Sequence, residues 1–178
     1  MNNRAEALAA RIEKGAGELA KFAEGLSDKE WHTAVRDGRP VGVCVHHVAS
    51  VYPIEIQLAQ GIASGKAITD VTWDAVADMN AKHAVDNANA TKDEAIDLLR
   101  RNSKEAATAV RSFTDEQLDT AAPFSLSFGA PVTAQFVLED HAVRHSWHHL
   151  ARIRSALRVR IKDSLGCGGG SRFFFSFI

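Results

Sequence analysis

Apolar residues recur at helical spacing along four long stretches of this 178-residue sequence, and no region is rich in strand-like patterns. The stretches cover about residues 4–25, 40–64, 72–113 and 131–157, and the third is interrupted between residues 87 and 91. Glycine, proline or a helix cap stands near their ends. The pattern predicts an all-α fold, a four-helix bundle with long connections, and argues against a parallel α/β sheet.

Local signals indicate where the helical segments begin. Three capping boxes, in which a hydroxyl and a Glu or Gln side chain satisfy free backbone N–H groups, are Ser27–Glu30, Thr91–Glu94 and Thr114–Gln117. Pro40 and Pro131 suit the first turn of a helix, so we expect the second and last long helices to open there. Pro53 predicts a kink in the second helix. Residues 123–129 are expected to be irregular, with a short extended segment.

The composition is that of one ordinary globular domain. Hydrophobic residues make up 46% and charged residues 24%, with a net charge of -1, which argues against a disordered chain and a nucleic-acid partner. The two cysteines, Cys44 and Cys167, give no disulfide framework, which favours a reducing cytoplasm. Neither a signal peptide nor an apolar run of about 18 residues is present, so no membrane span is expected.

The C-terminal segment differs in character from the rest. Residues 1–157 are predicted to form the bundle domain, whereas 158–178 are basic and then rich in glycine and phenylalanine. The net charge is +5 for residues 152–178 and -6 for residues 1–151. The tail is either a membrane or partner anchor or the product of an altered reading frame or cloning remnant.

Histidine is the unusual component, because four of the eight histidines lie within nine residues of the last helix: His141, His145, His148 and His149. At 100° per residue, His149 lies nearest the apolar face of that helix and His145 comes next. His141 and His148 are expected to point further outward. On the second helix His47 belongs to the apolar face and His46 does not.

These positions predict a metal site on His47, His145 and His149. Histidines four residues apart on a helix present imidazoles about 6 Å apart, close enough to share one ion at metal–nitrogen distances of about 2.0–2.1 Å. A third imidazole from a facing helix leaves the fourth tetrahedral position for water or substrate. Glu55, Asp140 and His141 are candidates for orienting the ligands.

The alternative is that these histidines are ordinary surface residues or hydrogen-bonded core residues. A pair four residues apart is by itself a weak signal, and the inward position of His47 is what strengthens it. His32, His46 and His83 are expected at the surface or at the rim of a pocket.

The segments His47-Val48-Ala49 and His145-Ser146-Trp147-His148-His149-Leu150-Ala151-Arg152-Ile153-Arg154 resemble motifs of the DinB-like superfamily, whose fold mycothiol-dependent enzymes share. The resemblance covers about residues 1–157. It implies an up-down-down-up four-helix bundle, usually dimeric, with zinc, nickel or a similar divalent ion on a histidine triad. The triad falls on His47, His145 and His149. Arg152 stands where the family often has glutamine, a departure that affects the pocket rim.

The resemblance also implies a choice of activities. Some members of the family use the metal to ionise a low-molecular-weight thiol such as mycothiol or bacillithiol, and the same ion would suit activation of water. We therefore expect a metal-dependent thiol transferase or hydrolase that acts on a small molecule, and the resemblance implies that it is a homodimer. The alternative is a non-enzymatic metal-binding module for stress response or ligand binding. Nucleic-acid binding is disfavoured, since the bundle is acidic.

Overall fold

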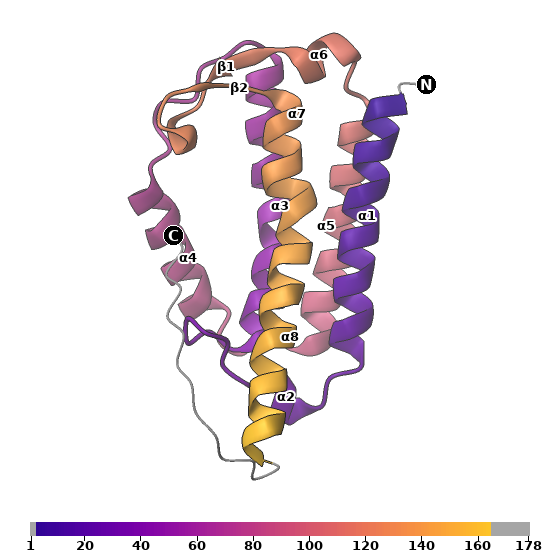
Figure 1. Cartoon of the computed structure of the whole chain (residues 1–178), viewed down its shortest axis with the longest axis vertical. Coiled ribbons are helices and arrows are strands. Elements are labelled where there is room, and N and C mark those ends of the chain that lie inside the picture. The colour runs from indigo at the N-terminus through magenta and orange to yellow at the C-terminus, as the bar shows by residue number, and fades with distance from the viewer. Residues whose placement is uncertain (1–2, 165–178) are drawn as a thin grey trace.

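The described residues form four long helical columns, which stand side by side in Figure 1. The structure, a computed structural model, describes residues 3–164. Three columns are α1 (Asn3–Glu24), α3 (Val41–Ala63) and α5 (Lys92–Arg111). The last column is composite: α7 (Ala134–Val137), a π-helix (Leu138–Val143) and α8 (Arg144–Ser164) follow without a break. α1 and the last column run in one direction and α3 and α5 in the other, which confirms the predicted four-helix bundle with its up-down-down-up order.

The columns bury their apolar faces in one shared core. α1 and α3 each pack against both α5 and the last column, so the four helices surround a common interior. Tyr52, Phe124 and Leu150 are among its largest fully buried side chains. On the surface Arg111 of α5 forms ion pairs with Glu6 and Glu13 of α1, at 2.9 Å each, although exposed pairs of this kind stabilise little.

The predicted caps are present. Ser27, Thr91 and Thr114 close capping boxes at α2 (Asp28–Trp31), α5 and α6 (Asp115–Asp119). Thr72 caps α4 (Trp73–Asp86), which is separate from α5. Pro40 precedes the first residue of α3 rather than occupying it, and α3 continues through Pro53.

The predicted start of the last helix at Pro131 is wrong. Pro131–Thr133 forms strand β2, which pairs antiparallel with β1 (Ala121–Pro123) on either side of a short 3₁₀ turn, Ser125–Ser127. The Thr133 side chain instead accepts a hydrogen bond from the Phe136 backbone N–H, so the helix begins at Ala134. An edge strand tolerates Pro131, since it lacks the N–H that an interior strand would need.

α4 lies on the connection between α3 and α5. These two columns run in the same direction, so the chain must return along the bundle, and Figure 1 shows α4 on that return, outside the four columns. None of its residues is buried.

The described chain contains no helix long and apolar enough to cross a membrane. α8 continues to Ser164, beyond the boundary predicted at residue 157, so the first part of the predicted tail has a helical backbone. Residues 165–178 of that tail lie outside the described residues.

Candidate metal centre

His47 of α3 and His145 and His149 of α8 converge inside the bundle. The ring centroid of His47 lies 5.1 Å from that of His145 and 5.3 Å from that of His149. The His145 and His149 rings stack at 4.8 Å, as successive turns of one helix allow. One nitrogen from each residue lies within 4.8 Å of the other two, so the group could hold a metal ion.

Two hydrogen bonds between α3 and α8 fix this arrangement. Glu55, two turns beyond His47 on α3, has its Oε1 2.5 Å from Nδ1 of His145. The other ring nitrogen of His145, Nε2, then faces Nε2 of His47 at 3.2 Å. A carboxylate that receives one imidazole N–H while the second nitrogen faces a metal is common in metal sites. Beside them, the buried Tyr52 hydroxyl and the Ser146 hydroxyl lie 2.7 Å apart and join the two helices.

Burial keeps two of the three imidazoles neutral. Removal from water lowers the pKa of His47 to about 3, with the nearby His145 acting in the same direction. Burial, followed by the charges of His145 and His47, also takes the pKa of His149 far below its ordinary value. Neutral imidazole is the form that binds metals, so at neutral pH protons do not compete for these two rings. The donor set therefore fits a divalent ion.

A cavity of about 540 Å³ lies beside the triad. Its apolar lining comes mainly from α3, α4 and the turn after β1, and includes Val51, Ile54, Leu58, Trp73, Val76, Met79 and Leu126. Its charged lining includes both the basic residues Arg39, Arg144 and Arg152 and the acidic residues Glu55, Asp70 and Asp140. The size suits a small organic molecule. Trp73, at 54% exposure, and the exposed Arg144 show that the cavity reaches the surface.

The histidines expected to point outward behave differently from each other. His148 is exposed, as predicted, and contributes to the edge of the cavity. His141 is not: it lines the cavity and its ring packs edge-on against Phe124 at 5.9 Å. The reason is the π-helix of residues 138–143, in which each residue turns through less than the 100° assumed for an α-helix.

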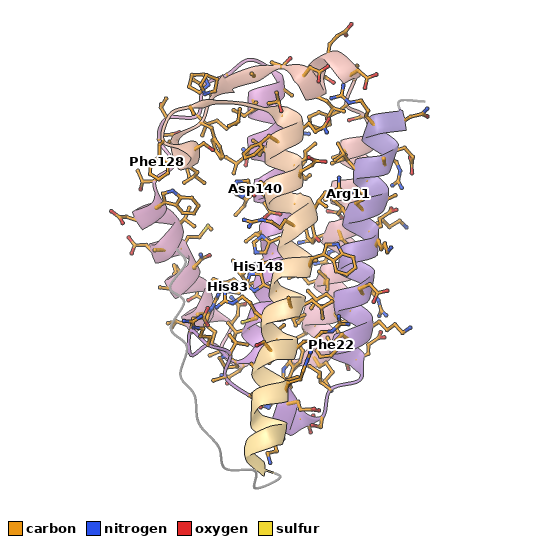
Figure 2. The ribbon with its side chains drawn as sticks, viewed as in Figure 1. Arg11, Phe22, His83, Phe128, Asp140 and His148 are labelled. Carbon is orange, nitrogen blue, oxygen red and sulfur yellow. The ribbon has the colours of Figure 1, made fainter. Side chains whose placement is uncertain are left out.

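The other candidates have separate roles. His46 and His83 bond to each other, Nδ1 to Nε2 at 2.9 Å, and so join α3 to α4, and the His83 ring also lies edge-on to that of His47 at 5.5 Å. Exposed His32 bonds to the Asp28 carbonyl away from the triad. Asp140 pairs with Arg144 at 3.2 Å rather than contacting a triad ring. Figure 2 shows His83, Asp140 and His148 along the side of the bundle that α4 covers.

Cys44 lies one turn before His47 but is a core residue. It is fully buried, and burial raises the pKa of its thiol to about 11. The thiol is therefore protonated at neutral pH and is a poor metal ligand or nucleophile.

Sequence reasoning missed Tyr52 and Arg39. Tyr52 lies five residues beyond His47, and its polar hydroxyl in an apolar run was the available signal for a buried partner. Arg39 precedes the helix in a Gly-Arg-Pro turn, where no periodicity assigns a direction to its side chain.

Residues 11–153, most of the chain, match the DinB superfamily. Among solved structures, YfiT from Bacillus subtilis, described as a probable metal-dependent hydrolase with an unusual four-helix bundle topology, superposes with a TM-score of 0.71 at 21% sequence identity, covering 88% of this chain and 87% of that one. No curated protein matches the sequence significantly. With its match over residues 11–153 and its histidine-bearing bundle, the chain belongs to the DinB superfamily.

Proposed function

We propose that this protein is a metal-dependent enzyme that uses zinc or nickel on His47, His145 and His149 to activate a small thiol or water. One observation supports this function above all: three imidazoles converge beside a cavity, and among residues 3–164 no fourth histidine, cysteine, aspartate or glutamate joins the group. Structural zinc sites have four protein ligands, whereas catalytic sites have three and an open position. YfiT, with the same fold, is described as a probable metal-dependent hydrolase.

His47, His145 and His149 would hold a divalent ion as neutral imidazoles, and the ion, with its full charge kept, would supply Lewis acidity toward a thiol or water. Glu55 holds the ring of His145 through Nδ1, and its second oxygen, Oε2, is buried without a hydrogen-bond partner among the described residues. That oxygen is suited to accept the proton that the thiol or water gives up. The sulfur or oxygen then bonds to an electrophilic carbon of the substrate, and the leaving group departs with its electron pair.

Metal analysis of three single alanine variants tests the ligand set. We expect the wild type to bind about one equivalent of zinc or nickel, because three imidazoles form a tight site, and His47→Ala, His145→Ala and His149→Ala to bind at least about tenfold more weakly. His32→Ala is the control, because this histidine is exposed and bonds to the Asp28 carbonyl away from the triad. Wild-type protein without metal after expression with both metals would overturn the proposal, as would equal binding by the triad variants.

Cobalt substitution separates an enzyme from a binding module. A thiolate-to-cobalt absorption band on adding a thiol supports thiol activation, and turnover of an activated ester without such a band supports hydrolysis. A spectrum that changes with neither thiol nor pH, together with no turnover, indicates a non-enzymatic metal-binding module.

A further inference from the structure

Arg39 carries a hydrogen-bonding group that the described protein does not use. The side chain lines the cavity and is 19% exposed. Its Nε and Nη2 both donate to Oδ2 of Asp37, at 3.2 and 2.8 Å. Its third nitrogen, Nη1, is buried and has no hydrogen-bond partner within the described part of the chain. A buried donor without a hydrogen-bond partner destabilises the protein by about 1–3 kcal/mol, and by more when it is charged. A ligand oxygen that accepts a hydrogen bond from this nitrogen would remove that destabilisation.

Asp37 does not neutralise this side of the cavity. The same oxygen, Oδ2, also accepts a hydrogen bond from Nη2 of Arg152, at 2.7 Å. Although burial opposes its ionisation, these bonds hold the pKa of Asp37 well below its usual range, so it carries one negative charge. Two guanidinium groups therefore share one carboxylate, which leaves an excess positive charge. The same contacts fix the orientation of the Arg39 guanidinium group and leave its Nη1 available to another hydrogen-bond partner.

Arg39 lines the same cavity as the triad of His47, His145 and His149. The same cavity has apolar lining residues, among them Val76 and Met79 of α4 and Leu58 of α3. A ligand that contacts Arg39, this apolar lining and the triad would have an anionic end, an apolar body and a reactive end.

We propose that Arg39, oriented by Asp37, binds a carboxylate on the small molecule whose reactive end lies at His47, His145 and His149. The inference rests on the proposed function, since the triad defines where the reactive end lies. Arg39 is then a specificity-determining residue, and the substrate or thiol is an anion at neutral pH.

Two thiols of equal length test this proposal on the cobalt-substituted protein. 3-Mercaptopropionate carries a carboxylate, and 3-mercaptopropan-1-ol carries a hydroxyl in its place. We expect the wild type to bind the carboxylate at least about tenfold more tightly, because a hydrogen bond to a charged group contributes about 1.5–3 kcal/mol. Arg39→Gln should reduce this ratio to near one and change the affinity for the alcohol by less than about threefold, because only the carboxylate uses Nη1.

Arg11→Gln is the matched control. Arg11 does not line this cavity, and its side chain is 52% exposed and pairs with Glu139, so the variant should keep the preference. Should Arg39→Gln not fold, Arg39→Lys retains a positive charge beside Asp37 and lacks the planar fork, and it should lower the ratio severalfold. A ratio near one in the wild type, or an unchanged ratio in both Arg39 variants, overturns the proposal.

A second experiment distinguishes failure of the Arg39 proposal from failure of the proposed metal-dependent function. Calorimetric titration of the metal-free protein with the same two thiols should show the same preference at lower affinity, because Arg39 is not a metal ligand. Cobalt that binds without a carboxylate preference overturns the Arg39 proposal alone. Protein that binds no cobalt overturns the metal-dependent function, and the metal-free titration then decides whether Arg39 binds a carboxylate.

Discussion

His47 and His149 are buried among apolar side chains, and this makes them sensitive to pH in a defined direction. Each is 5% exposed, so protonation would place a charge where water cannot reach it. Removal from water is the main reason that the pKa of His47 is lowered from its ordinary value of 6.5 to about 3. The same effect that prepares the rings for a metal therefore makes the metal-free protein vulnerable to acid.

The stability of the metal-free protein should fall as the pH drops below about 6.5 and continue to fall toward pH 3. In this window the unfolded chain binds a proton at residue 47 that the folded chain excludes, so folding becomes less favourable by up to about 1.4 kcal/mol per pH unit for each such histidine. Urea unfolding at pH 7.5, 6.5 and 5.5 measures this slope.

His47→Gln supplies the control for that measurement. Glutamine does not titrate, so the slope of unfolding free energy against pH should decrease by as much as one proton, whatever the absolute stability of the variant. An identical slope in wild type and variant would show that His47 is protonated equally in the folded and unfolded states.

Short elements set the position of the long ones. The π-helix between α7 and α8 turns His141 toward the cavity. At the other end of the molecule, Trp31 of α2 is buried against the start of α3 and donates its Nε1 hydrogen to the Ala90 carbonyl at 3.2 Å. This contact requires a glycine at residue 42, because an added Cβ there would lie 2.5 Å from the Trp31 ring.

Gly42→Ala should destabilise the fold by about 1–3 kcal/mol, because the indole must move out of a filled space. Gly17→Ala on α1 is the matched variant: nothing lies within 4 Å of its added Cβ, and glycine in a helix interior is unfavourable. It should stabilise the fold by as much as about 1 kcal/mol. Chemical denaturation of both variants measures the difference, and a Gly42→Ala protein as stable as the wild type would contradict the close packing of Trp31.

At the scale of the molecule, the bundle divides into a stable frame and a covering segment. α1, α3, α5 and α8 bury their apolar faces in one core, whereas no residue of α4 is buried. α4 nevertheless supplies Trp73, Val76 and Met79 to the cavity wall. Its side-chain links to α3 include the hydrogen bond between His83 and His46 and the edge-on contact of the His83 ring with that of His47, at 5.5 Å between centroids. The element that covers the triad is thus held by fewer buried contacts than the elements that carry it.

Hydrogen exchange should reveal this difference. Backbone amides of residues 73–86 should exchange at least about 100-fold faster than those in the middle of α3 or α5, because opening α4 exposes little apolar surface. Native-state exchange read by mass spectrometry measures the rates, with α5 as the internal reference. Equal protection of α4 and α5 would mean that α4 opens only when the whole bundle unfolds.

Much of the fold could be predicted from the sequence, because local interactions between side chains and the backbone determine where helices begin and end. The hydroxyl of Thr91 and the carboxylate of Glu94 bond to backbone groups three residues away, so the capping box both predicts and forms the start of α5. The helix face on which His47, His145 and His149 lie could also be predicted, since the periodicity of the neighbouring apolar residues gives the direction of each ring. Their convergence then follows from packing apolar faces together.

The sequence by itself determined the class of fold, the positions of most helix ends and the three histidines that meet. Packing in three dimensions set the rest: the strand at Pro131, the π-helix that redirects His141, the position of α4 beside the cavity and the orientation of Arg39. The difference lies in the sequence separation of the interacting residues. Helical periodicity and capping involve residues three or four positions apart. An arginine fixed by a carboxylate, or a helix that packs on a distant neighbour, depends on contacts that only the folded chain creates.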